Sequence, residues 1–165
     1  YSIYIVAKRD GTSSGLSGDR DYLFDGIAES AQNNTQERSL VALNRSGKIQ
    51  MWAMNQWADT TFSSPTDYFV LSAIFNTSNS SFALNGTNVT GLTVGTSSLT
   101  NGMTLGSNVL ANNDFLNGNI AEFLILDETS SSSTRETVEG YLAHKWGLSG
   151  SLPTTHLYKN SPPVQ

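Results

Sequence analysis

Residues 115–147 read FLNGNIAEFLILDETSSSSTRETVEGYLAHKWG and decide the fold class. Their first part, residues 115–126, has the apolar pattern of a β-strand, and the remainder carries the signals of one helix that ends at Trp146-Gly147. The chain before residue 115 reads as short strands separated by turns. A single helix after the last strand therefore predicts an all-β protein with one C-terminal helix.

The helix signals agree with one another. Ser133 and Glu136 have the spacing of a capping box, and Gly147 can adopt the left-handed conformation that ends a helix. Spacings of i, i+3, i+4 and i+8 predict an apolar face made of Val138, Tyr141, Leu142 and Trp146. We expect a helix from about Thr134 to Trp146, with Tyr141, Leu142 and Trp146 buried and Arg135 and Glu139 exposed.

Strand signals follow one another at short intervals upstream of the helix. They predict strands at residues 1–8, 21–25, 39–44, 48–53, 68–76, 80–84, 87–89, 103–107 and 119–126. Arg45-Ser46-Gly47 and Asn85-Gly86 are predicted hairpin turns. Some nine strands without βαβ alternation favour an antiparallel β-sandwich or jelly roll.

Length and composition restrict the function classes. The 165 residues suit a single domain, 1–165, with a substantial core, and there are no cysteines. The formal charge of −5 and the scattered Lys and Arg residues argue against nucleic acid or an anionic membrane as partner. Charged residues make up only 14% of a chain rich in Asn, Ser, Thr and Gly, which is typical of extracellular, cell-surface and virion β-proteins. The chain has no apolar run of membrane-spanning length.

Several separated segments resemble the laminin-G-like and concanavalin A-like jelly rolls. These are Ala7-Lys8-Arg9-Asp10-Gly11, Leu84-Asn85-Gly86, Leu105-Gly106 and Gly118-Asn119-Ile120-Ala121-Glu122. The helix 139–148, followed by Leu152-Pro153 and His156, looks like the tail of the bacterial and phage branch of that superfamily. The resemblance implies the fold, and it implies no single activity, because members include lectins, adhesion modules, virion components and spacers.

The resemblance also bears on the start of the chain. Such domains usually carry a further strand before the one that begins here at Tyr1, so the domain is expected to be trimmed at its N-terminus or completed by a neighbour. We therefore expect the strand at residues 1–8 to lie beside a position that the chain itself does not fill.

A catalytic role finds little support in the carboxylates. Retaining glycosidases hold two carboxyl groups about 5–5.5 Å apart. Glu122 and Asp127 point to opposite faces of a regular strand, and Glu122 and Glu128 would lie roughly 20 Å apart. We expect Glu122 to be a structural hydrogen-bonding residue and the protein not to be an enzyme; glycoside hydrolase is the third and weakest function.

Calcium is the most credible ion, because hard cations take oxygen ligands at loop ends. The candidate ligands are Asp19, Asp21 and Asp25, or alternatively Asp114 with Asn112 and Asn113. Asp and Asn are also ordinary turn formers, and this alternative stays open.

Glycan binding needs exposed aromatic rings beside amide and carboxylate groups, since sugar C–H faces stack on rings while hydroxyls need directional partners. Trp57 fits this description on a predicted loop, and the candidate glycan site is Asn55, Gln56, Trp57 and Asp59. Packing of the loop by Trp57 is the alternative. Trp52 is expected to face the core and Trp146 to pack the helix onto the sandwich.

These observations predict a non-catalytic recognition or adhesion module of an extracellular or virion protein, with a glycan or cell-surface polysaccharide as ligand. The alternative is a structural virion decoration or appendage component that docks on other protein subunits. A lectin should present a polar site with an exposed Trp, whereas a decoration protein should present contacts on a sheet edge or on the helix.

Overall fold

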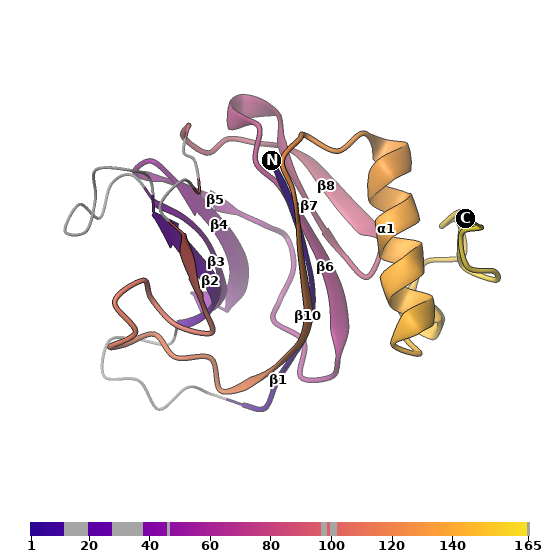
Figure 1. Ribbon diagram of the computed structural model, residues 1–165, viewed down its shortest axis with the longest axis horizontal. Helices are drawn as coiled ribbons and strands as arrows, with labels where there is room; N and C mark the ends of the chain where they lie inside the picture. Colours follow the sequence, from indigo (N-terminus) through magenta and orange to yellow (C-terminus); the bar gives the residue numbers. More distant parts are fainter. Residues whose placement is uncertain (12–19, 28–37, 46, 97–98, 100–101, 165) are drawn as a thin grey trace.

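The computed structural model describes residues 1–11, 20–27, 38–45, 47–96, 99 and 102–164. Within these residues, ten strands form two five-stranded antiparallel sheets, and one α-helix lies against the outer side of one sheet (Figure 1). The all-β sandwich with a C-terminal helix that the sequence predicts is confirmed.

The two sheets are named here by their strands. The first sheet has the order β10-β1-β6-β7-β8 and contains β1 (Ser2–Arg9), β6 (Phe69–Ile74), β7 (Ser80–Leu84), β8 (Thr87–Leu92) and β10 (Gly118–Leu126). The second sheet has the order β5-β4-β3-β2-β9 and contains β2 (Asp21–Ile27), β3 (Arg38–Arg45), β4 (Lys48–Ala53), β5 (Gln56–Asp59) and β9 (Met103–Leu105). The chain passes between the sheets after β1, β5, β8 and β9. The helix is α1 (Ser132–Lys145), and 3₁₀ turns occur at Thr77–Asn79 and Ser149–Ser151.

The core lies between the sheets and is built by alternate side chains of each strand. In β1, Ile3 and Ile5 enter this core and are fully buried, while Tyr4 and Val6 point to the opposite side, under the helix. Each such fully buried aliphatic side chain contributes about 1.5–3 kcal/mol. Because both faces of β1 are covered, its run of consecutive apolar residues is explained.

The predicted vacancy beside the first strand is wrong. β1 pairs with β10 on one side, from Ser2 opposite Leu126 to Arg9 opposite Gly118, and with β6 on the other. The long β10 occupies the position that was expected to be filled by a neighbour. β1 is therefore a central strand.

Strand β5 was not predicted, because its turn lacks the usual sequence signal. The β4–β5 hairpin turns at Met54 and Asn55, which have positive φ angles of 44° and 64°. Two successive positive φ angles are typical of a type I′ turn, but Met is rare at such a position. The predicted turn at Asn85-Gly86 has the same backbone form, with φ angles of 49° and 78°, and is confirmed.

The predicted capping box of the helix is wrong by two residues. The N-cap is Ser131, whose hydroxyl oxygen accepts a hydrogen bond of 3.1 Å from the backbone N–H of Thr134. Ser133 lies inside the first turn, and Thr134 takes the position that Glu136 was expected to hold. In a run of four serines, each can serve as a cap, and the packing of the helix selects one of them.

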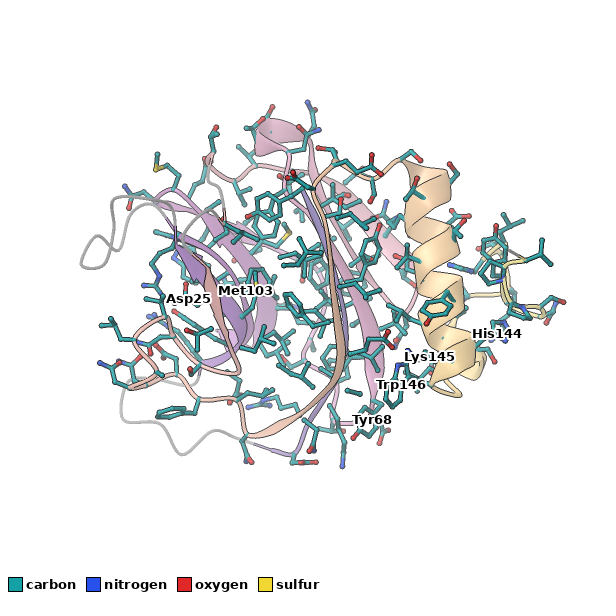
Figure 2. The ribbon with its side chains drawn as sticks, viewed as in Figure 1. Asp25, Tyr68, Met103, His144, Lys145 and Trp146 are labelled. Carbon is teal, nitrogen blue, oxygen red and sulfur yellow. The ribbon has the colours of Figure 1, made fainter. Side chains whose placement is uncertain are left out.

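The predicted apolar face of the helix is right for Leu142, which is buried, and for Val138, which is partly buried against the same apolar cluster, but it is wrong for Tyr141 and Trp146. Arg135 and Glu139 are buried, at 6% and 0% exposure, whereas Tyr141 and Trp146 are 44% and 42% exposed. Lys145 and Trp146 project from the last turn of α1 (Figure 2). The helix packs with Arg135 and Glu139 facing the sheet, because hydrogen bonds satisfy these buried charged groups. A search for periodic apolar residues cannot detect such a buried polar side.

Candidate functional site: an aromatic depression on the second sheet

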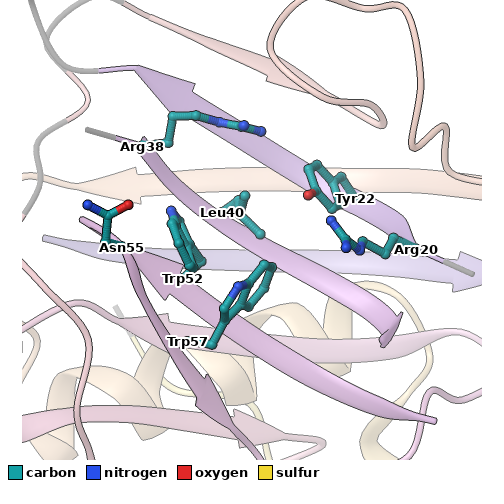
Figure 3. Close-up of a pocket in the computed structure, with 7 residues that line it drawn as sticks. All are labelled: Arg20, Tyr22, Arg38, Leu40, Trp52, Asn55 and Trp57. Atoms are coloured by element: carbon teal, nitrogen blue, oxygen red, sulfur yellow. The ribbon is translucent and has the colours of Figure 1, made fainter. Parts of the chain in front are cut away.

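A depression of about 260 Å³ lies on the outer face of the second sheet (Figure 3). Its lining residues come from the start of β2, from β3 and from the β4–β5 hairpin; they are Arg20, Tyr22, Arg38, Leu40, Trp52, Asn55 and Trp57. Leu40 and Tyr22 are almost fully buried and, with Ala42, form a small apolar cluster of their own, separate from the main core. The depression thus has an apolar base and a partly polar rim.

The two tryptophans form the centre of the depression. Trp52 on β4 and Trp57 on β5 are cross-strand partners in the hairpin, with ring centroids 4.8 Å apart and planes inclined by 55°. Cross-strand neighbours on the same face of a sheet are close enough for such ring contacts. Both rings are only half-buried, so part of each remains available to a ligand.

Arg38 is held at the rim by a buried carboxylate. Its Nε donates a 2.8 Å hydrogen bond to Asp25 Oδ1, and its Nη2 bonds to the other carboxylate oxygen. Oδ2 also accepts a hydrogen bond of 2.7 Å from the backbone N–H of Val109. The Arg38 side chain is 15% exposed and that of Asp25 is fully buried. The guanidinium is therefore fixed in position by a fork that is shielded from solvent.

The electrostatics of this pair follow from its burial. Burial raises the pKa of Asp25 above its ordinary value, against the opposing hydrogen bonds and charge of Arg38. Burial alone would lower the pKa of Arg38, but the hydrogen bonds and charge of Asp25 outweigh it and raise that pKa. With three N–H donors directed at the carboxylate, the ionised pair is the form that the geometry supports.

Tyr22 and Arg20 occupy the opposite end of the depression from Arg38 and Asn55 (Figure 3). Burial raises the pKa of the Tyr22 hydroxyl, while a hydrogen bond with Arg20 acts in the opposite direction. Tyr22 is therefore neutral at physiological pH, and its hydroxyl is a hydrogen-bonding group beside a cation.

Two of the four predicted glycan-site residues line the depression, and two do not. Trp57 and Asn55 line the depression, although Trp57 lies on strand β5 and not on a loop as predicted. Gln56 and Asp59 are exposed and do not line it. Asp59 points to the same face as Trp57 and accepts a hydrogen bond from the side-chain amide of Gln50. Gln56 alternates to the other side of the strand.

Sequence reasoning missed most of the site. Trp52 was expected in the core, and this is wrong: its ring lies beside Trp57 on the outer face. Strand alternation carried the signal, because Ile49, Met51 and Ala53 on β4 are fully apolar and buried, which leaves Gln50 and Trp52 on the other face. Arg20, Tyr22 and Arg38 also line the depression. Their proximity to the tryptophans depends on the pairing of β2, β3 and β4, which the sequence alone does not reveal.

Two of the candidate calcium ligands, Asp21 and Asp25, have arginine partners in the structure. Asp21 forms a buried ion pair with Arg9, which joins the start of β2 to the end of β1, and Asp25 binds Arg38. The backbone carbonyl of Asp114 accepts a hydrogen bond from the N–H of Tyr22, and Asp19 lies outside the described residues. In the described part of the chain, no three His, Cys, Asp or Glu side chains gather as a metal-binding group.

Glu122 has the structural role that was predicted for it. Its carboxylate on β10 accepts a 2.9 Å hydrogen bond from Lys145 Nζ and another from the indole N–H of Trp146. Burial disfavours its ionisation, but these two hydrogen bonds outweigh that effect and lower its pKa. Trp146 thus anchors the end of α1 through its polar edge while much of its ring stays exposed.

Comparisons with known proteins add no assignment: no family model and no curated protein matches the chain. A search of the described residues for an apolar helix of membrane-spanning length finds none.

Proposed function

We propose that the protein is a non-catalytic carbohydrate-binding domain that uses the aromatic depression of the second sheet. The observation that carries the proposal is the Trp52–Trp57 pair, half-buried on an outer sheet face and flanked by Asn55 and two arginines. Rings of this kind stack on the C–H faces of sugars, while amide and guanidinium groups bind their hydroxyls. An extracellular, cell-surface or virion setting and the laminin-G-like relationship belong to the same proposal.

The test is the loss of glycan binding in Trp57→Ala. A stacked aromatic ring contributes about 0.5–1.5 kcal/mol beyond its buried area, so its removal should abolish a weak lectin interaction on a glycan array. Tyr141→Ala is the matched control, because Tyr141 is an exposed aromatic residue on the opposite side of the sandwich. Binding that survives in Trp57→Ala, or that is lost in Tyr141→Ala, would exclude the depression as the glycan site.

A second candidate is a structural component that docks on other subunits. It is favoured by exposed apolar side chains on α1 and the segment after it: Tyr141 and Trp146, and Leu157 at 68% exposure. Cross-linking of the protein within its native surface assembly should then modify Lys145, whose side chain is 45% exposed beside these residues. Absence of cross-links through Lys145, together with glycan binding by the isolated chain, would decide against this candidate.

A further inference from the structure

The charged residues around the aromatic depression indicate which class of sugar it would bind, an inference that rests on the proposed function. We propose that the depression selects acidic saccharides, and that the carboxylate or sulfate group of the sugar binds at the Arg20–Tyr22 end while the ring stacks on the tryptophans. The chain as a whole would repel such a ligand, since its formal charge is −5 and it has only nine Lys and Arg residues. Binding of an acidic sugar therefore requires a local excess of positive charge at the depression.

The lining of the depression is locally positive. Among the described residues that line it, there are two guanidinium groups, from Arg20 and Arg38, and no carboxylate. Among the described acidic residues, Asp25 and Asp114 are 0% and 9% exposed. Asp59 is exposed on the same face as Trp57, but it lies outside the lining and accepts a hydrogen bond from the side-chain amide of Gln50. An anion inside the depression would thus lie closer to the two guanidinium groups that line it than to Asp59 outside it, and the buried Asp25 is neutralised by Arg38.

The two arginines are not equivalent. Arg38 gives its Nε and Nη2 to Asp25, so its charge is largely balanced, and it serves to shape the rim. Arg20 shares a hydrogen bond with Tyr22, which is neutral. Within the described part of the lining, Arg20 is therefore the group that supplies net positive charge, and a guanidinium can bind a carboxylate or a sulfate through two parallel N–H donors.

The two tryptophans favour an anionic sugar over other kinds of anion. Inorganic anions and phosphorylated chains need cations but gain nothing from Trp52 and Trp57. A uronic or sulfated sugar presents both a C–H face for the rings and an anionic group for Arg20. The combination of half-buried rings and a cation within one depression of about 260 Å³ matches one or two sugar units, not a polymer surface.

Two pairs of polysaccharides test the inference and separate its two anion sources. Polygalacturonic acid is compared with its methyl ester for the carboxylate, and dextran sulfate is compared with dextran for the sulfate. We expect the parent protein to bind at least one acidic polymer about tenfold or more tightly than its neutral counterpart in titration calorimetry, and the preference to weaken as salt is added.

Arg20→Gln should remove the preference for the acidic polymer. Arg20→Lys should keep part of it, because lysine retains the positive charge but lacks the two parallel N–H donors of the guanidinium. Lys48→Gln is the matched control, since it makes the same charge change on an exposed residue of β4 outside the depression. A preference that persists in Arg20→Gln, or that disappears equally in Lys48→Gln, would overturn the inference.

The failure of this inference can be told apart from the failure of the proposed function. Binding of neutral sugars with equal or greater affinity, lost in Trp57→Ala, would overturn acidic selectivity and leave the carbohydrate-binding proposal standing. Absence of binding to all four polymers and to a broad neutral glycan array would overturn both.

Discussion

The outer faces of the two sheets are covered by different kinds of structure. On the first sheet, Tyr4, Val6 and Val70 are covered by Leu142 and Ala143 of α1 and by the segment that follows it. On the second sheet, the described residues place no helix over the outer face; Tyr22, Leu40 and Ala42 are partly covered by Trp52 and Trp57. One face is covered by a helix, and in the described part of the chain the other is covered by its own aromatic side chains, which leaves a depression.

Polar groups behave differently on the two faces as well. Under α1, the Glu139 carboxylate is fully buried, accepts hydrogen bonds from Ser72 and from Arg135 Nη1 at 2.6 Å, and lies 3.3 Å from His156 Nε2. This network is internal and satisfied by its own members. On the second sheet, the Arg38 fork lies at the rim of a surface depression. The buried polar groups of the first outer face are thus enclosed by the helix, whereas those of the second lie at the edge of a solvent-accessible depression.

The largest effect is expected from breaking the network under the helix. Glu139→Ala should cost about 3–5 kcal/mol in the free energy of unfolding, because it removes the buried partner of Arg135 and leaves that guanidinium with the partly exposed Glu136 at 3.3 Å. Urea denaturation measures the loss. The double variant Arg135→Met, Glu139→Leu should recover most of it, since both charges are then replaced by apolar groups; a double variant as unstable as Glu139→Ala would contradict this account.

The next effect distinguishes the true buried side of α1 from the side predicted by periodicity. Leu142→Ala should lower the free energy of unfolding by about 2–5 kcal/mol, because Leu142 is fully buried. Tyr141→Ala, at the neighbouring exposed position, should change it by no more than about 0.5 kcal/mol. Equal destabilisation by the two changes in thermal melts would mean that the helix packs in another rotation.

A smaller loss is expected on the aromatic face. Trp52→Ala removes a ring that is half-buried, so it should cost about 1–2 kcal/mol, less than the about 3–5 kcal/mol of a fully buried Trp. Calorimetry of the melting transition provides the value, and glycan binding should fall at the same time. A loss as large as that of Leu142→Ala would show that this face, too, is mainly structural.

The smallest effect concerns Glu122 and depends on pH. Its pKa in the folded protein is lowered below the ordinary value of 4.5, so its ionised form stabilises the fold above that value. Glu122→Gln should cost no more than about 1 kcal/mol at neutral pH. The difference from the parent should shrink as pH falls below about 4.5 and the parent carboxylate takes up a proton. A difference that grows with acidification would reverse the assigned direction.

Most strands could be predicted because burial on one or both faces leaves a local pattern. The segments Lys48–Ala53 and Ser80–Leu84 were found with their observed bounds. β5 was missed because its turn is formed by Met54 and Asn55, whose positive φ angles are imposed by the pairing of Trp52 with Trp57 and not by a glycine. The helix was found, but its rotation was not, since its buried side contains Arg135 and Glu139.

The amino-acid sequence by itself determined the class of the fold, the single C-terminal helix and the presence of an aromatic residue, Trp57, near polar groups. Those features follow from local periodicity and from residue types. Only the tertiary structure decided that β1 is central, that α1 buries its charges, and that Trp52, Arg20 and Arg38 join Trp57 around one depression. The physical reason is that strand pairing and the satisfaction of buried charges join residues far apart in the chain, and no local pattern records such partners.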